Sequence, residues 1–229
     1  MIGIIGAMRI EVDELKAQIK NSVTEVISGI EYCTGYLYGK QVVVAVCGIG
    51  KVNAAICTQT MILKYPVNII LNTGIAGGMS PKIKIGDIVI GSALVQHDMD
   101  TSSLGDPLGF IFGINRVEIP SSDILVERLE KVAKKIQGLK VHKGIIATGD
   151  QFIGDKEKLY PIVDRFGAIA CEMEGASIAQ VCYVNQVDFA VVRSISDNAD
   201  SESTVDFIEF QHMAAKNSIE MIKHFLIED

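Results

Sequence analysis

Acidic residues near the ends of apolar runs are the strongest candidates for chemistry in this chain of 229 residues. Glu11, Glu174 and Asp197 each follow a short apolar run that is typical of a buried β-strand. Carboxylates in such places can accept hydrogen bonds from sugar hydroxyls, activate water or protonate a leaving group. Glycoside-type hydrolysis needs that chemistry, with one acid, one base and an oxocarbenium-like transition state.

Glycine-rich turns and soft apolar residues lie beside these acids. In open α/β sheets ligands bind at the carboxyl ends of the strands, so the residues after each predicted strand mark one common edge. A single acidic residue at this edge is more often a solvated charge or a helix cap. Acidic residues after the ends of three strands favour a ligand-binding or catalytic site. An apolar lining is expected from Met8, Ile49, Phe152 and Met173. Together these residues suit a small, flat, uncharged ligand that carries hydroxyls.

Other common kinds of site fit the sequence poorly. Gly48-Ile49-Gly50 begins a G-x-G pattern, but Asn53 replaces the third glycine of a dinucleotide fingerprint. Ala45 stands where the phosphate-binding loop of an NTPase needs glycine. The segment His97-Asp98-Met99-Asp100 has metal-capable side chains, but no further ligand spacing accompanies it. We therefore expect neither a metal nor a cofactor.

Alternating strands and helices must position these candidates. Several strand-length runs are apolar at every position, which is typical of strands covered on both faces. Helix-period segments lie between them, so we predict an α/β fold with a mostly parallel sheet between helical layers, in a single domain over residues 1–229. The predicted strands are Ile2–Ile5, Val42–Val46, Asn68–Asn72, Asp87–Val95, Lys143–Thr148, Ala168–Cys171 and Phe189–Ile195. The predicted helices are Lys51–Tyr65, Ser121–Gln137, Met173–Asn185 and Phe207–Ile227.

Composition argues against several other classes of protein. The chain has 21 Lys and Arg against 28 Asp and Glu, a net charge of −7, and it lacks the basic stripe of a nucleic-acid binder. No apolar run approaches the ~18 residues that a membrane span needs. The first residues indicate a strand rather than a signal peptide. Five scattered cysteines without metal spacing suit reduced thiols, so we expect a cytoplasmic protein.

Motifs in order along the whole chain carry a resemblance to a known family. They are Gly3–Met8 with Glu11, Gly48–Val52, Asn72–Gly74 with Ala76–Gly78, Gly149-Asp150 with Phe152, Glu172–Glu174 and Ser196-Asp197. With these motifs the sequence resembles the 5′-methylthioadenosine/S-adenosylhomocysteine nucleosidases of the purine nucleoside phosphorylase/uridine phosphorylase superfamily. The resemblance implies a three-layer αβα sandwich with a central twisted mixed β-sheet, like that of nucleoside phosphorylases.

The resemblance also implies a reaction and the residues that perform it. The N9–C1′ bond of an adenine nucleoside would be hydrolysed, which releases adenine and a 5-thio-ribose product in methionine salvage and S-adenosylmethionine by-product recycling. 5′-Deoxyadenosine would be a further substrate. Asp197 would protonate N7 of the leaving adenine, and Glu11 would hold and deprotonate the attacking water. Glu174 would accept the ribose hydroxyls, with Met173 packed beneath the sugar.

The same resemblance assigns the remaining binding residues. Phe152 would stack on adenine, and Ile153 would present backbone groups to its polar edge. Ala76 and Gly77 would line the base and ribose site with their backbones. The 5′-alkylthio pocket would be lined by Met8, Ile49 and Phe207, and the substrate-binding set is completed by Glu172 and Ser196.

Family members close the 5′ pocket with a loop from the other subunit of a homodimer. In this chain that loop would lie near Thr101–Pro107. Two departures from the family pattern bear on the site. Ile75 replaces a small polar residue that is common in the glycine turn, and Leu104 falls where an aromatic residue is often found.

Three alternative functions remain open at this point. Some relatives with a stretch similar to Asp106–Phe110 also act on 6-amino-6-deoxyfutalosine. A phosphorylase of the same fold would need positive charge or an anion nest for phosphate, and Arg9 and Arg193 are the only arginines near the predicted edge. A non-catalytic nucleoside-binding protein could keep the fold, although all three acids are present.

Overall fold

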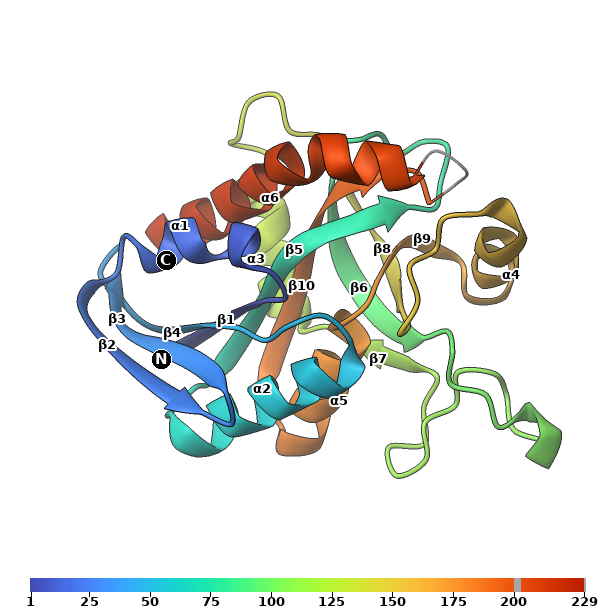
Figure 1. Cartoon of the computed structure of the whole chain (residues 1–229), viewed down its shortest axis with the longest axis horizontal. Coiled ribbons are helices and arrows are strands. Elements are labelled where there is room, and N and C mark those ends of the chain that lie inside the picture. The colour runs from blue at the N-terminus through green and yellow to red at the C-terminus, as the bar shows by residue number, and fades with distance from the viewer. Residues whose placement is uncertain (200–202, 229) are drawn as a thin grey trace.

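The computed structural model describes residues 1–199 and 203–228, which build a ten-stranded mixed sheet (Figure 1). The strands are β1 (Ile2–Gly6), β2 (Lys20–Ile27), β3 (Ile30–Leu37), β4 (Lys40–Val46), β5 (Ile69–Gly78), β6 (Ile88–Gln96), β7 (Glu118–Pro120), β8 (Val141–Thr148), β9 (Ala168–Glu172) and β10 (Asp188–Asp197). Their order is β10-β6-β8-β9-β5-β1-β4-β3-β2, with β7 beside β6. An additional pairing of β10 with β5 closes one end of the sheet into a ring.

Helices cover both faces of the sheet, which confirms the predicted α/β sandwich. They are α1 (Asp13–Lys16), α2 (Lys51–Lys64), α3 (Asp123–Ala133), α4 (Lys156–Phe166), α5 (Gly175–Asn185) and α6 (Ser203–Ile227), with short 3-10 turns η1 (Arg9–Glu11) and η2 (Ser102–Leu104). Figure 1 shows the long α6 crossing one face together with α1, and α2 beside α5 on the other face. Among the described residues, no helix is long and apolar enough to cross a membrane.

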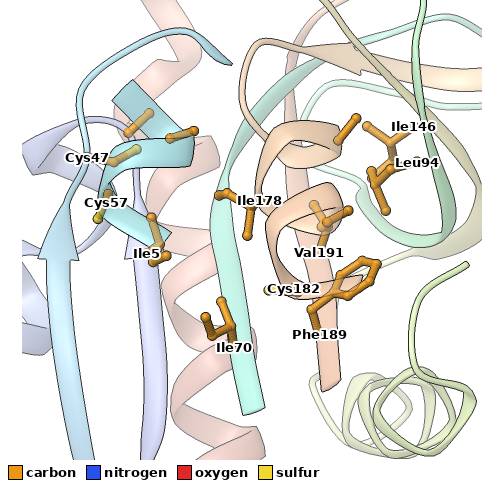
Figure 2. Packing of buried hydrophobic residues seen from close by; sticks show 14 of the residues in the cluster. Ile5, Cys47, Cys57, Ile70, Leu94, Ile146, Ile178, Cys182, Phe189 and Val191 are labelled. Atoms are coloured by element: carbon orange, nitrogen blue, oxygen red, sulfur yellow. The ribbon is translucent and has the colours of Figure 1, made fainter. Parts of the chain in front are cut away.

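Strand alternation explains why the central strands are apolar at every position. In β4, Val42 and Val44 pack with α1, α3 and α6, whereas Val43 and Ala45 face the α2 and α5 side. Because successive side chains of a strand point to opposite faces, each strand contributes side chains to two separate cores, one on each face of the sheet. Figure 2 shows the second of these cores, where Ile5 and Ile70 of the sheet lie with Cys57 and Ile178 of the covering helices.

The sheet is mixed, which confirms the fold that the resemblance implies and corrects the mostly parallel sheet expected from the apolar runs alone. β1, β4, β5 and β10 run parallel to one another, and β6, β8 and β9 form a second parallel group. The two groups meet in antiparallel pairs, β10 with β6 and β5 with β9. The hairpin of β2 and β3 adds further antiparallel pairing beyond β4.

The carboxyl ends of the two parallel groups converge on one point. β5 pairs with β9 only near the end of each strand, where Gly77 lies opposite Cys171. The end of β10 lies beside the same part of β5, because Asp197 pairs with Gly77. The ends of β5, β9 and β10 and the segments that follow β1, β8 and β9 can therefore contribute to a common site. β5 runs on to Gly78, so the glycine-rich stretch predicted to follow this strand is part of it.

Candidate active site

A cavity of about 130 Å³, partly open to solvent, lies where these strand ends converge. Its lining residues are Ala7, Met8, Glu11, Ile49, Ile75, Ala76, Gly77, Phe152, Cys171, Glu172, Met173, Glu174, Ser196, Asp197 and Phe207. The structure thus brings together every site residue predicted from sequence except Ile153. That residue is buried beside an adjoining small cavity, which shares Phe152, Met173 and Asp197 with the larger one.

Glu11 is buried at the end of the turn that follows β1. Its carboxylate accepts hydrogen bonds from the backbone N–H groups of Ala7 (2.7 Å), Met8 (2.8 Å) and Ile75 (3.1 Å). Burial raises the pKa of Glu11, while the charge of Arg193 and the three N–H donors act in the opposite direction. The result is a desolvated carboxylate with a fixed orientation, which suits a general base.

Arg193 lies fully buried behind the acidic residues of the cavity. Its Nη2 donates to Asn72 Oδ1 at 2.7 Å and to Glu172 Oε2, and it lies 3.6 Å from Glu174 Oε2. Burial acts to lower the pKa of Arg193, but the neighbouring carboxylates outweigh it and raise this pKa. A buried charge is costly unless it is paired, so Arg193 and the acids depend on one another.

Gly74 makes this arrangement sterically possible. A Cβ atom at that position would overlap both the Arg193 guanidinium and the Glu11 carboxylate. The absence of a side chain therefore lets the buried cation approach the carboxylate across the β5 backbone.

Glu172 and Glu174 have different neighbours although they are two residues apart. β9 ends at Glu172, so the extended geometry that would align the two side chains does not continue to Glu174. The Glu172 carboxylate turns to the start of α5 and accepts from the backbone N–H groups of Glu174 and Gly175. Glu174 instead accepts from the Gly50 N–H at 2.9 Å. Burial and the charge of Glu172 raise the pKa of Glu174 to about 7.

Asp197 ends β10 and is almost fully buried. Its Oδ2 accepts from the Ser196 hydroxyl at 2.9 Å, and its Oδ1 accepts from the Ala199 N–H at 2.9 Å. Burial raises the pKa of Asp197, although these donors and the Ser203 side chain oppose the shift. A raised pKa favours the protonated form of the carboxyl group, which is the form that a general acid needs.

Aromatic and aliphatic side chains form the open side of the cavity. Phe152, which is 46% exposed, lies edge-on to Phe207 with ring centroids 5.8 Å apart and an interplanar angle of 85°. The two rings join the loop after β8 to the first turns of α6. Met8 and Ile49 complete the apolar rim. A flat ring and a thioether would both find apolar contacts here.

Comparison with known proteins shows the family to which this chain belongs. The model of the phosphorylase superfamily matches residues 1–227. The chain is 42% identical to the 5′-methylthioadenosine/S-adenosylhomocysteine nucleosidase of Shewanella loihica, over 97% of this chain and 99% of that protein. The chain belongs to this nucleosidase family of the phosphorylase superfamily.

Solved structures of family members have the same fold. The nucleosidase of Neisseria meningitidis, in complex with methylthio-immucillin-A, matches with a TM-score of 0.96 at 34% identity, over 100% of this chain and 99% of that chain. A futalosine hydrolase of Helicobacter pylori matches with a TM-score of 0.95 at 38% identity, over 100% and 97% of the two chains.

Three lining residues of this family member were not assigned a role from sequence. Ala7 lies in the same motif as Met8, Cys171 directly precedes the motif Glu172–Glu174, and small size is their only signal. Ile75, which was noted as a departure, gives Glu11 its backbone N–H while its side chain packs against Ala214 and Ala215. Its contact with Glu11 is therefore independent of residue type.

The role of Arg193 was also missed, because it was considered only as a phosphate ligand. The sequence does indicate a buried ion pair, because Arg193 lies inside an otherwise apolar strand. A charged residue in such a strand must find buried partners. In the segment His97–Asp100, both oxygens of Asp98 accept from N–H donors, which belong to Lys51 and Asp150.

Proposed function

We propose that this chain hydrolyses the N-glycosidic bond of 5′-methylthioadenosine and S-adenosylhomocysteine, and also that of 5′-deoxyadenosine. Adenine and the 5-substituted ribose are the products. One observation carries the proposal: Glu11, Glu174 and Asp197 line one cavity, and each has a different set of donors. The names of the relatives of the chain support the same reaction.

Asp197 is the proposed general acid. Burial raises its pKa, which favours the protonated carboxyl group that can give its proton to N7 of the leaving adenine. The Ser196 hydroxyl fixes the orientation of this carboxyl group. Protonation of the base weakens the N9–C1′ bond, because the electrons of that bond move into a neutral leaving group.

Glu11 is the proposed general base. Backbone donors hold both of its oxygens, with Oε2 toward Ala7 and Met8 and Oε1 toward Ile75. The carboxylate takes one proton from the attacking water, and the remaining hydroxide oxygen bonds to C1′. Adenine leaves with the proton from Asp197, so one water is consumed, and solvent returns the proton from Glu11 to Asp197.

The ribose and the base are held by the remaining lining residues. Glu174 accepts hydrogen bonds from the ribose hydroxyls, and Met173 packs beneath the sugar. Phe152 stacks on adenine, and Ile153 offers its backbone to the polar edge of the ring. Backbone atoms near the base and ribose come from Ala76 and Gly77, further side chains from Glu172 and Ser196, and the 5′-alkylthio lining from Met8, Ile49 and Phe207.

Hydrolysis rather than phosphorolysis is favoured by the charges at the site. Neither Lys nor Arg is among the described residues that line the cavity. Arg193 lies behind the lining and already pairs with Glu172 and Glu174. A phosphate ion would therefore meet acidic side chains rather than the cationic or amide donors that it requires.

A product assay tests the proposal. The purified protein is incubated with 5′-methylthioadenosine or S-adenosylhomocysteine, and adenine and the sugar product are quantified by chromatography. We expect equal amounts of the two products from each substrate. If the protein binds these nucleosides but releases no adenine, a non-catalytic binding protein is the correct interpretation.

A second candidate substrate is 6-amino-6-deoxyfutalosine. The futalosine hydrolase of Helicobacter pylori shares 38% identity with this chain over its full length, which favours including this compound. An apolar 5′ pocket discriminates weakly between similar groups, so one site could accept several 5′ substituents. The substrate preference is measured by comparing kcat/KM for 5′-methylthioadenosine, S-adenosylhomocysteine and 6-amino-6-deoxyfutalosine.

A cytoplasmic homodimer is the proposed assembly. α2 and α5 lie side by side and expose large apolar residues at Val52, Ile56, Leu63 and Val184 (Figure 1). An exposed apolar patch of this kind is typical of an interaction surface. We propose that a second copy covers it and that segment Thr101–Pro107 of that copy closes the 5′ pocket. Five free, buried cysteines suit a reducing compartment.

A further inference from the structure

Two loops that contribute side chains to the cavity lining are far apart in the sequence and in the strand order. Residues 48–51 follow β4 and include Ile49, whereas residues 149–153 follow β8 and include Phe152. In the strand order, β9, β5 and β1 lie between β8 and β4. Pairing of neighbouring strands therefore does not fix the distance between these two loops.

A third segment joins the loops through one carboxylate. Asp98, just after the end of β6, accepts from the Lys51 ammonium through Oδ1 at 2.7 Å and from the Asp150 backbone N–H through Oδ2 at 2.9 Å. Gln96 Oε1 receives a second bond from Lys51 Nζ at 3.3 Å. Burial disfavours the charge on Asp98, but Lys51 and the Asp150 N–H outweigh this effect and lower its pKa.

Asp150 closes the connection from the other side. Its Oδ1 accepts from the Lys51 backbone N–H at 2.8 Å, at the first residue of α2. The carboxylate thereby satisfies one of the N–H groups that the start of a helix leaves without an intrahelical partner. Gly50, at φ +98°, leaves room for it, since a Cβ there would come within 3.0 Å of the same oxygen.

Both ends of this connection reach residues with proposed roles in substrate binding. On one side, the Gly50 N–H donates to Glu174, and Gly50 directly precedes Lys51. On the other side, Asp150 lies two residues before Phe152. A shift of either loop would therefore move a group that holds the ribose or one that holds the base.

We infer that Asp98 is a positioning residue that, with Lys51 and Asp150, clamps the ribose side of the site to the base side. These three residues are called the Asp98 clamp. None of them lines the cavity, so the clamp acts through Glu174 and Phe152 rather than on the substrate. The inference rests on the proposed function, because it assigns a role in that same site.

The test compares Asp98→Asn with a matched variant elsewhere in the protein. The side chains of the Lys51–Asp98 pair are 19% and 15% exposed, and those of the His142–Asp87 pair are 18% and 12% exposed. Asp87 also accepts a backbone N–H, from Lys84, and it directly precedes β6, outside the clamp and outside the cavity lining. Asp87→Asn therefore removes a similar carboxylate without touching the clamp.

Asp98→Asn is expected to lower kcat/KM for 5′-methylthioadenosine by roughly ten- to a hundredfold, because small misplacements of binding groups are costly. Calorimetric affinity for adenine alone should weaken as well, since the Phe152 loop is released. Asp87→Asn should leave both quantities within about twofold of the wild type, even where the two variants lose similar thermal stability.

A double variant of Lys51 and Asp98 shows whether the two residues act as one unit or whether each substitution lowers kcat/KM independently. Lys51→Met alone should reproduce the Asp98→Asn phenotype, and combining the two should add little, because both break the same contact. Losses that multiply would overturn the inference, as would an Asp98→Asn variant that resembles Asp87→Asn. If Asp98→Asn does not fold, Lys51→Met gives the same comparison. An inactive wild type would contradict the proposed function instead, while adenine affinity would still test the clamp.

Discussion

At the scale of single residues, Asp197 makes the sharpest prediction. Asp197→Asn keeps the shape of the side chain but removes the proton donor, so kcat should fall by about 10²- to 10⁴-fold. Affinity for an uncleavable adenine nucleoside should change far less. Steady-state kinetics and calorimetry measure the two quantities. Asp188→Asn, at the exposed start of the same strand, is the control and should behave as the wild type. Full turnover by Asp197→Asn would remove Asp197 from the mechanism.

The raised pKa of Glu174 should make the free energy of unfolding depend on pH. The pKa of Glu174 is raised from its ordinary value of 4.5 to about 7 in the folded protein, so the folded state holds a proton that the unfolded state releases between these values. Stability therefore falls as the pH rises through this window. At about 1.4 kcal/mol per pKa unit, the loss amounts to up to about 3 kcal/mol.

Glu174→Gln should remove that loss. Urea unfolding should show the variant to be more stable than the wild type near pH 8, by about 1–3 kcal/mol, with a much smaller difference near pH 5. The same variant should have a raised KM, since an amide accepts ribose hydroxyls less strongly than a carboxylate. A stability difference that does not change with pH would contradict the assignment.

At the scale of elements, the start of α5 depends on Glu172. This carboxylate accepts from the first N–H groups of the helix and pairs with the buried Arg193. Glu172→Ala should cost about 3–5 kcal/mol of unfolding free energy, because it leaves a buried cation without its main partner. Glu25→Ala removes an acid from the exposed pair with Lys64 and should cost less than about 1 kcal/mol. Equal losses in denaturant titrations would contradict the structural role of Glu172.

Whether a helix or strand could be predicted from the sequence depended on how deeply it is buried. Strands covered on both faces, such as β1 and β4, show continuous apolar runs and were identified from sequence. β2 was missed because its residues are exposed or half-buried, so the hairpin with β3 left no apolar run.

α4 was also missed, because Pro161 interrupts an otherwise helical pattern. Its signals were present in the sequence: Asp155 caps the helix by accepting from the Lys158 N–H, and Gly167 ends it in a left-handed conformation.

The set of residues that meet at the cavity was predicted from sequence, but the contacts that support these residues were not. Motifs at strand ends identify residues whose types matter for chemistry, and these residues converge on one cavity. The contacts that support them come from residues distant in sequence, as with Glu174 and Gly50 or Arg193 and Asn72. Such pairs depend on strand order, which local patterns do not contain.

At the scale of the whole molecule, the proposed dimer predicts which surface tolerates a charge. Leu63 on α2 is 76% exposed, and Val23 on β2 is 66% exposed. Leu63→Glu should convert the dimer to a monomer in light scattering, because it places a charge in an apolar interface. Val23→Glu should leave the mass unchanged.

The monomer should also lose activity per subunit with long 5′ substituents, since the partner's loop no longer closes the pocket. A wild-type protein that is monomeric and fully active at micromolar concentration would contradict the shared pocket.

The central claim is that water, placed by Glu11, attacks C1′ while Asp197 protonates adenine. The most direct measurement is the reaction of 5′-methylthioadenosine in water enriched in oxygen-18, with and without phosphate, followed by mass spectrometry of the sugar. We predict one labelled oxygen in methylthioribose and the same rate of adenine release in both mixtures. A sugar phosphate as product, or adenine release only when phosphate is present, would contradict it.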